Sequence, residues 1–451
     1  MELTPKRQRL LLAAVMSGLL LAMLDQTIVG TALPEIVSRL GGDSLYVWVV
    51  TAYLVAATVS LPIYARLSDR YGRRRLLLIG MVIFLLGSGL SAAAQSMEEL
   101  VAFRALQGLG AGALEGLTFI LVADLYSGKR NAALQGAMAG LMGVSFILGP
   151  LLGGFIADGI GWRWVFLVNL PIGLVALAVV ACVLPASIGR SEDRRMKLDL
   201  KGIALLTLAI GLVLIGLSER EAVLLIAGLV PLAAFVWVER RASAPIIPPA
   251  LFAERKTGAI LVAGAFGAFG MFAGLLLLPR YFQTVEGASA THSGVLIYPL
   301  LIGLIISVNV AGGVIAKRGE YRTVVLGGMV LLVLGALGFA TFDAGTPTWE
   351  SLLFMALIGL GVGPQLSGLQ IAMMRVLEPA RIGGGLGTLM LLRQVGAAVA
   401  LAAAETIYSR GDDPAVATGT GIVVIAVVGA VIATAALLSV PRPATRFALA
   451  T

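Results

Sequence analysis

Three ionisable residues lie inside long apolar stretches of the sequence, and their types and spacing could support proton transfer or cation binding. Asp25 is about 15 residues into the first apolar run, whereas Arg104 and Glu115 share a later one. A charged side chain in such surroundings is costly, so it usually has an oppositely charged partner or a function. An aspartate and an arginine at similar depth would remove each other's cost by pairing. The alternatives are an aspartate at a helix end in the interface and an arginine whose head reaches the surface.

Glu115 follows Arg104 by eleven positions, which sets its place on the same predicted helix. At 100° per residue, these steps end about 20° past three full turns, so both side chains share one helix face. The rise per residue places Glu115 about 16 Å further along the helix axis. An acid facing a cavity there could carry a proton or attract a cationic molecule. The alternative is a permanently protonated glutamate that is hydrogen-bonded between helices.

The composition around these residues is that of an integral membrane protein. Hydrophobic residues make up 59% of the 451 residues and charged residues only 13%, whereas soluble domains are about 25% charged. The basic residues behind the net charge of +8 lie in short loops, so they indicate membrane orientation rather than nucleic-acid binding. The one histidine and the one cysteine, Cys182, leave no histidine-rich metal site and no internal disulfide.

A membrane-spanning helix needs about 20 apolar residues, and fourteen segments of the chain meet this requirement. The predicted spans are 10–30, 46–64, 76–95, 100–121, 134–156, 164–184, 200–218, 222–238, 258–279, 293–316, 323–342, 352–373, 384–408 and 421–440. Only three charged residues separate the seventh and eighth, so a re-entrant hairpin is the alternative there. Lys and Arg are biased between alternate loops, with 26 on the side of the N-terminus and five on the other. Cytoplasmic loops carry such an excess, so both termini are predicted to be cytoplasmic.

A dense charged turn at residues 65–75 joins the second and third predicted helices. It contains Asp69, Arg70, Gly72, Arg73 and Arg74; the glycine permits a tight turn, and the aspartate could cap a helix or pair with arginines. The simplest interpretation of the basic residues is a topology signal. Residues 312–322 repeat the turn weakly, without the aspartate. The repeat predicts two six-helix bundles, residues 1–189 and 257–451, separated by two inserted helices with cytoplasmic loops at 190–256. Duplicated halves are a transporter architecture.

Four blocks of sequence together resemble the major facilitator superfamily and, more narrowly, its fourteen-spanner drug:proton antiporters, which are multidrug efflux transporters. The blocks are residues 24–34 (LDQTIVGTALP), 65–75, 104–112 (RALQGLGAG) and 149–154 (GPLLGG), and residues 248–252 and 393–396 resemble the same branch. The resemblance implies the major facilitator fold with two inserted helices. It also implies that the charged turn is a latch that stabilises the outward-open state, and that Arg104 takes part in proton coupling.

The resemblance extends to a kink in the fifth predicted helix. Gly149, Pro150, Gly153 and Gly154 match a pattern that marks proton-driven exporters in the family. Proline kinks a helix and small residues allow close helix contact. Ordinary glycine-rich membrane packing is the alternative.

Other polar residues in the predicted spans are expected to have lesser roles. Those that could face a cavity are Gln107, Asn309, Gln370, Arg393 and Gln394, although interhelical hydrogen bonding is the commoner role. Arg393 lies deep enough to need a partner or water. Glu405 is expected near the outer surface in contact with solvent, and Arg280 is assigned to an outer loop.

The sequence thus predicts an all-α polytopic membrane protein that exports lipophilic or cationic small molecules by alternating access. Protons from outside would reach Asp25 and Glu115, so a proton gradient would drive transport without a cofactor. The expected partners are the lipid bilayer and the transported molecule, without nucleic acid. The chain is expected to be a monomer in a bacterial cytoplasmic membrane, with a role in antibiotic resistance.

Two alternatives remain at this stage, and an enzyme is not favoured. One alternative is an exporter with a dedicated substrate, such as a lipid, siderophore or amino acid. The other is a non-transporting membrane sensor. No nucleophile–base arrangement, phosphate-binding loop or metal-ligand cluster in the sequence indicates catalysis.

Overall fold

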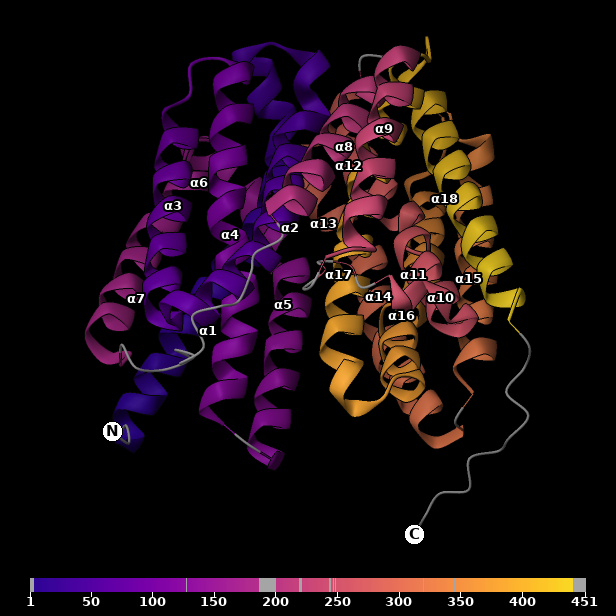
Figure 1. The fold of residues 1–451 in the computed structure, drawn as a ribbon. Coiled ribbons are helices and arrows are strands. Elements are labelled where there is room, and N and C mark those ends of the chain that lie inside the picture. The colour runs from indigo at the N-terminus through magenta and orange to yellow at the C-terminus, as the bar shows by residue number, and fades with distance from the viewer. Residues whose placement is uncertain are drawn as a thin grey trace. The chain divides into compact units, whose positions relative to one another are not determined.

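The computed structural model describes residues 4–126, 128–185, 200–218, 221–242, 245, 247, 249–318, 320–343 and 345–440. The long apolar stretches of this part of the chain are helical (Figure 1). A helix satisfies its backbone N–H and C=O groups internally, which an apolar chain needs where lipid offers no hydrogen-bond partner. The predicted all-α class is confirmed.

The chain divides into two compact units, each with its own packed helices. The first comprises Met1–Thr207 with the later segment Ala288–Val295, and the second comprises Leu208–Gly287 and Leu296–Thr451. The predicted three-part division into residues 1–189, 190–256 and 257–451 stays a prediction.

The first unit contains a helix, α4, that packs closely on both α2 and α3. The elements of this unit are α1 (Pro5–Leu40), η1 (Asp43–Leu45), α2 (Tyr46–Tyr71), α3 (Arg73–Ala93), α4 (Met97–Leu125), α5 (Gly128–Ile160), α6 (Trp164–Leu167), α7 (Asn169–Val183) and most of the short α13 (Ala290–Leu296). A side chain on Gly108 would overlap the backbone of Tyr53 in α2, and one on Gly110 would overlap the backbone of Phe84 in α3. Glycines therefore let three helices approach at backbone distance, as small residues do in membrane bundles.

The start of α4 is set by local capping. The Oγ of Ser96 accepts the N–H of Glu99 at 3.3 Å, and the Oε2 of Glu99 accepts the N–H of Gln95 at 2.9 Å. This exchange satisfies backbone donors that a helix start leaves free. It fixes where α4 begins, and hence where Arg104 lies along it.

The second unit contains a comparable helix, α16, that packs on α14 and α15. The elements are α9 (Ala222–Glu239), α10 (Ala250–Ala253), α11 (Arg255–Phe266), α12 (Phe269–Thr284), α14 (Tyr298–Arg318), α15 (Tyr321–Gly338), η2 (Phe339–Thr341), α16 (Thr348–Val376), α17 (Pro379–Tyr408) and α18 (Pro414–Leu438), and the chain enters this unit within α8 (Leu200–Ser218). A side chain on Gly359 would overlap the carbonyl of Leu300 in α14, and one on Gly361 would overlap the backbone of Leu332 in α15.

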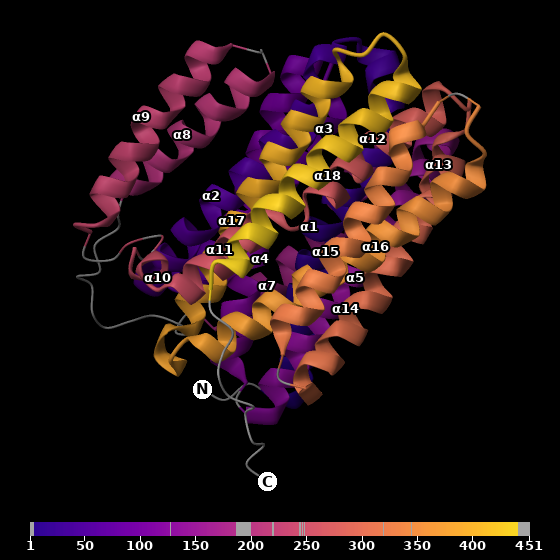
Figure 2. The same cartoon turned by 90° about the vertical axis from the view of Figure 1, so that its right-hand side faces the viewer.

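Twelve helical segments of the described chain are long and apolar enough to cross a membrane, so the prediction of fourteen spans is not supported. The difference falls on the seventh and eighth predicted spans. They form helices α8 and α9, which lie side by side (Figure 2). Their described apolar parts are Lys201–Val213 and Val223–Glu239, and these are not among the twelve.

The charged turn between the second and third predicted helices is almost entirely helical, in contrast to the predicted loop. Helix α2 continues to Tyr71 and α3 begins at Arg73, so Gly72 alone separates them. Gly72 has φ of 92°, a conformation that residues with a Cβ rarely adopt. The expectation that this glycine permits the tight turn is confirmed. The charged residues of this segment therefore lie at two helix ends rather than in a loop.

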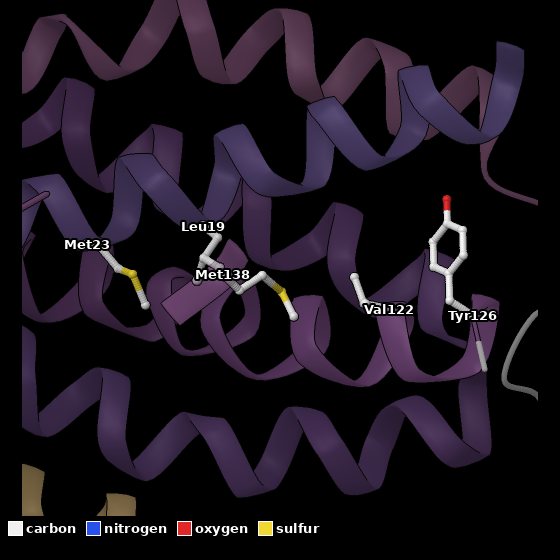
Figure 3. Close-up of a cluster of buried hydrophobic side chains, with 5 residues drawn as sticks. All are labelled: Leu19, Met23, Val122, Tyr126 and Met138. Carbon is white, nitrogen blue, oxygen red and sulfur yellow. The ribbon is translucent and has the colours of Figure 1, made fainter. Parts of the chain in front are cut away.

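A cluster of buried apolar side chains joins α1, α4 and α5 in the first unit (Figure 3). Its members are Leu19 and Met23 from α1, Val122 from α4, Met138 from α5, and Tyr126, which directly follows α4. Burying such side chains stabilises the contact between their helices, because close packing gains dispersion energy even where lipid is the solvent. The cluster fixes α1 against α4, the two helices that carry the candidate site.

Candidate functional site

Asp25 and Arg104 form a buried ion pair between α1 and α4. The Nη1 of Arg104 donates to the Oδ2 of Asp25, and each residue is only 1% exposed. The other carboxylate oxygen, Oδ1, accepts the Nε2 of Gln107 at 2.9 Å and the Nδ2 of Asn169 at 3.0 Å. The structure thus brings together the two charges whose similar depth predicted pairing, and both oxygens of the carboxylate have partners.

The guanidinium of Arg104 is held on its other sides as well. Its Nε donates to the carbonyl of Val49 in α2 at 3.1 Å, and its Nη1 also donates to the Oε1 of Gln107 at 2.7 Å. The ring of Tyr53 lies 4.2 Å from its central carbon, within the range of a cation–π interaction. The hydroxyl of Tyr53 donates in turn to the carbonyl of Ala22 in α1 at 2.9 Å.

Ser88 in α3 completes the network. Its Oγ accepts the Nε2 of Gln107 at 3.2 Å and the Nδ2 of Asn169 at 2.9 Å, and donates to the carbonyl of Phe166 at 2.8 Å. Five helices of the first unit (α1, α2, α3, α4 and α7) therefore contribute side chains to one buried polar cluster. A buried network whose members all have partners is rigid, so this cluster fixes helix positions and leaves Asp25 little free capacity to bind a further group.

Glu115 is in a different environment, although it shares α4 with Arg104. It is half-buried, and its Oε1 accepts the Nε2 of Gln26 in α1 at 2.6 Å. Within the described part of the chain it has no Lys or Arg partner. The carboxyl group is therefore partly accessible and accepts a hydrogen bond from one neutral donor. When it is ionised, no positively charged side chain among the described residues neutralises it. This is the setting in which an intramembrane acid binds a proton or a cation.

The predicted latch residues contact neighbouring helices where the structure describes their side chains. The Nε of Arg73 lies 3.0 Å from the Oδ2 of Asp124 at the end of α4, and its Nη1 donates to the Oγ of Ser68. The Nη2 of Arg74 donates to the carbonyl of Ala181 in α7. The side chains of Asp69 and Arg70 lie outside the described residues.

The glycine–proline segment of α5 packs directly on α1. A side chain on Gly149 would overlap Thr27, and one on Gly153 would overlap the carbonyl of Ile28. The Oγ1 of Thr31 lies 3.3 Å from the carbonyl of Pro150 inside the helix. Another face of the segment is close to α13, because a side chain on Gly154 would overlap the Ala290 carbonyl.

A second buried ion pair lies in the second unit and corrects two expectations. The Nη1 of Arg280 in α12 lies 3.0 Å from the Oε1 of Glu405 in α17, and the two residues are 7% and 8% exposed. Arg280 is therefore a helix residue rather than part of an outer loop, and Glu405 is not a solvated surface acid. The ring of Tyr408 lies 4.2 Å from the central carbon of Arg280. Pairing explains the burial of both charges.

The remaining predicted polar residues do not gather into one cluster. Gln107 belongs to the Asp25 network, whereas Asn309 is exposed and donates to the carbonyl of Ile305 within its own helix, at 2.7 Å. Gln370 in α16 and Arg393 and Gln394 in α17 are half-buried. The described residues contain no group of three or more His, Cys, Asp or Glu side chains that could hold a metal ion.

Long apolar helices with charges paired inside them define a polytopic membrane protein, and similarity to known proteins shows its class. The family model described as Major Facilitator Superfamily matches residues 15–401. The multidrug transporter protein MdtP of Bacillus subtilis is 34% identical over 396 residues, which cover 85% of this chain and 72% of that protein. Multidrug resistance protein 3 of the same organism is 33% identical over 428 residues, which cover 91% and 82%.

The chain belongs to the major facilitator superfamily. A solved structure of the nucleoside transporter NupG matches with a TM-score of 0.68 at 13% sequence identity, over 95% of this chain and 99% of that one, which shows the shared fold. The protein is accordingly a membrane-spanning transporter and not an enzyme.

Proposed function

We propose that the protein is a proton-driven exporter of lipophilic, cationic small molecules that works by alternating access. The names of its relatives as multidrug transporters support the substrate class. The glycine–proline segment of α5, which in this family accompanies proton-driven export, supports the direction of transport. The fourteen-spanner branch is part of the same proposal, with α8 and α9 as the inserted pair.

The observation that carries the proposal is the contrast between the two acids of the first unit. Asp25 is neutralised by Arg104 and surrounded by donors, so a proton there would have to displace an ion pair. Glu115 is half-buried and has only the neutral Gln26 as a partner among the described residues. We therefore assign proton and cation binding to Glu115, and assign Asp25 to holding α1, α4 and α7 together.

The proposed cycle uses one carboxyl group for two competing ligands. Ionised Glu115 binds the cationic part of the substrate from the cytoplasmic side, where the Nε2 of Gln26 orients the carboxylate. A proton arriving from outside neutralises the group and removes its attraction for the cation. The substrate then leaves on the outer side, and the gradient drives the exchange in one direction.

We also propose that the protein lies in a bacterial cytoplasmic membrane with both termini inside the cell. The excess of Lys and Arg in the loops on the side of the N-terminus supports this orientation. It places the α2–α3 turn in the cytoplasm. The ion pair of Arg73 with Asp124 would then tie this turn to the cytoplasmic end of α4, as a latch between conformations requires.

The proposal is tested by efflux of a fluorescent lipophilic cation from proteoliposomes with an imposed pH gradient. Wild-type protein should transport the cation, and Glu115→Gln should lower the gradient-driven rate at least about tenfold, because the amide cannot exchange a proton at this position. Glu35→Gln is the matched control, since Glu35 also lies on a helix of the first unit but pairs with Arg39 at the surface. It should leave the rate unchanged.

Three outcomes would contradict the proposal in different ways. A normal rate in Glu115→Gln would show that another group carries the proton. A rate of cation transport that does not depend on the pH gradient would show that transport is not coupled to protons. An absence of cation transport in the wild-type protein would instead favour an exporter with a dedicated substrate.

A further inference from the structure

Arg393 is an arginine inside a membrane-spanning segment whose charge is not matched by a carboxylate in the described structure. It lies in α17, within the candidate span Gly385–Tyr408, about 12 Å from the start of that span. The hydrogen bond that the structure describes for it is donated by Nη2 to the carbonyl of Leu366 in α16, at 3.5 Å. That distance is at the limit of a hydrogen bond, and a guanidinium has five N–H donors.

The other arginines buried in membrane-spanning segments are neutralised. Arg104 pairs with Asp25, and Arg280 pairs with Glu405. Each of these pairs avoids the large cost of an isolated buried charge. Arg393 is half-buried rather than enclosed, so its unused donors can be reached by another molecule.

Arg393 contacts α16 in the helical turn that leads to a second polar residue, Gln370. In a helix, the carbonyl of Leu366 accepts the N–H of the residue four positions later, which is Gln370. The guanidinium therefore meets α16 at the turn that carries the Gln370 side chain. This side chain is half-buried, and in the part of the chain that the structure describes it makes no hydrogen bond. A cation with free donors and an amide with a free N–H group are the components of an anion site.

We propose that Arg393 and Gln370 form a binding site for a carboxylate or phosphate group on an otherwise apolar molecule. The guanidinium would bind two oxygens of the anion through parallel N–H donors, and the amide would donate a further hydrogen bond. The anion would belong either to a transported amphiphile or to a lipid headgroup. In the first case the substrate range extends from cations to lipophilic acids and zwitterions. That part depends on the proposed export function, whereas binding of the anion does not.

The test measures binding rather than transport, so failure of proton-driven efflux would leave it intact. Full-length protein in phosphatidylcholine nanodiscs is titrated with a dansylated undecanoate and with its uncharged primary amide, and bound probe is followed by fluorescence. We expect the wild-type protein to bind the carboxylate about tenfold more tightly than the amide. Arg393→Gln should bind both probes equally, and Arg393→Lys should keep part of the preference.

Arg375→Gln is the matched control. Arg375 also donates from its Nη2 to a backbone carbonyl, that of Ile315 at 3.2 Å, but it lies in the last turn of α16. The preference for the carboxylate should survive this substitution. Unchanged preference in Arg393→Gln would overturn the proposal. If that variant does not fold, Gln370→Ala and Arg393→Lys decide the question together. An unaltered preference for the carboxylate in both variants would overturn the proposal, because neither the amide nor the paired donors of the guanidinium would then contribute to binding.

The source of the anion is separated by changing the lipid. Phosphatidylglycerol carries its headgroup phosphate without the choline cation that neutralises it in phosphatidylcholine, so nanodiscs of this lipid supply a net anionic competitor at high local concentration. If the wild-type protein loses undecanoate binding in these discs and the Arg393→Gln variant does not, the lipid is identified as the natural occupant. Equal binding in both lipids would identify the anionic group of a transported molecule. Either result supports an anion site at Arg393.

Discussion

Substitution of Asp25 by asparagine should destabilise the first unit strongly, because it leaves a buried guanidinium without a counter-ion. Asp25 and Arg104 are each 1% exposed, so water cannot replace the lost partner. The remaining described contacts of Arg104 include the carbonyl of Val49, the amide of Gln107 and the rings of Tyr53 and Phe166, all of which are neutral. Removing one member of a buried ion pair costs about 3–5 kcal/mol. Asparagine keeps the shape of the side chain and one acceptor, so we expect about 3 kcal/mol.

The assay is reversible unfolding in mixed micelles with increasing denaturing detergent, from which the free energy of unfolding is obtained. Asp25→Asn, Arg104→Gln and the double variant form a double-mutant cycle. The double variant contains no unpaired charge, so it should recover part of the loss, with a coupling energy of at least about 2 kcal/mol. Glu35→Gln removes an ion pair at the surface and should change stability by less than about 1 kcal/mol.

The reasoning would be refuted by two results taken together. One is a loss below about 1 kcal/mol in each single variant, and the other is additivity in the double variant. They would mean that Arg104 finds another counter-charge or water when Asp25 is neutral. The dry, fully partnered cluster would then be an incorrect description of this site.

Two further substitutions test the packing of α5 and the second ion pair. Gly153→Ala should lower the free energy of unfolding by about 1–3 kcal/mol, because its methyl group would overlap the carbonyl of Ile28, whereas Gly159→Ala in the same helix meets no atom within 4 Å and should be neutral. Glu405→Gln should lower the thermal midpoint measured in detergent, since Arg280 loses the carboxylate 3.0 Å away, and an added Arg280→Gln should restore much of it. An unchanged midpoint in Glu405→Gln would mean that this ion pair does not contribute to folding.

Much of the helical organisation could be predicted because long apolar stretches have one stable form in a membrane. The prediction was wrong at residues 65–75, where a run of charged residues was interpreted as a loop between two helices. The charged residues around Gly72 continue two helices, because arginine is a good helix former and only the glycine adopts a conformation that turns the chain. The prediction of fourteen spans was not supported, since twelve helices of the described chain are long and apolar enough to cross a membrane.

Only the charged residues of the candidate site could be predicted from the sequence. Asp25 and Arg104 were expected to pair because an isolated charge in an apolar helix is expensive. Ser88, Asn169 and Tyr53 were missed, since neutral polar residues are common in such helices and nothing in their local sequence indicates a partner far along the chain. Their contacts depend on how α2, α3 and α7 pack around α4, which is tertiary information.

Arg280 and Glu405 were predicted wrongly for another reason: each was expected to be exposed to solvent because its side chain is charged. Both were placed at the outer surface because they lie near helix ends. They are buried because each supplies the counter-ion that the other needs. A charged residue near a helix end can therefore be assigned to solvent only after a partner on a neighbouring helix has been excluded.

The pairing of Asp25 with Arg104 also determines how the first unit responds to voltage. A membrane potential does electrical work on net charge, about 2.3 kcal/mol per elementary charge for each 100 mV, and two opposite charges in contact carry none. Helices α1 and α4 can therefore move through the field without electrical work on this pair. The charge that remains on their facing surfaces is that of Glu115, which is present only when its carboxyl group is ionised and empty of a cation. In the proposed cycle, protonation or substrate binding would make this region of the first unit electrically silent.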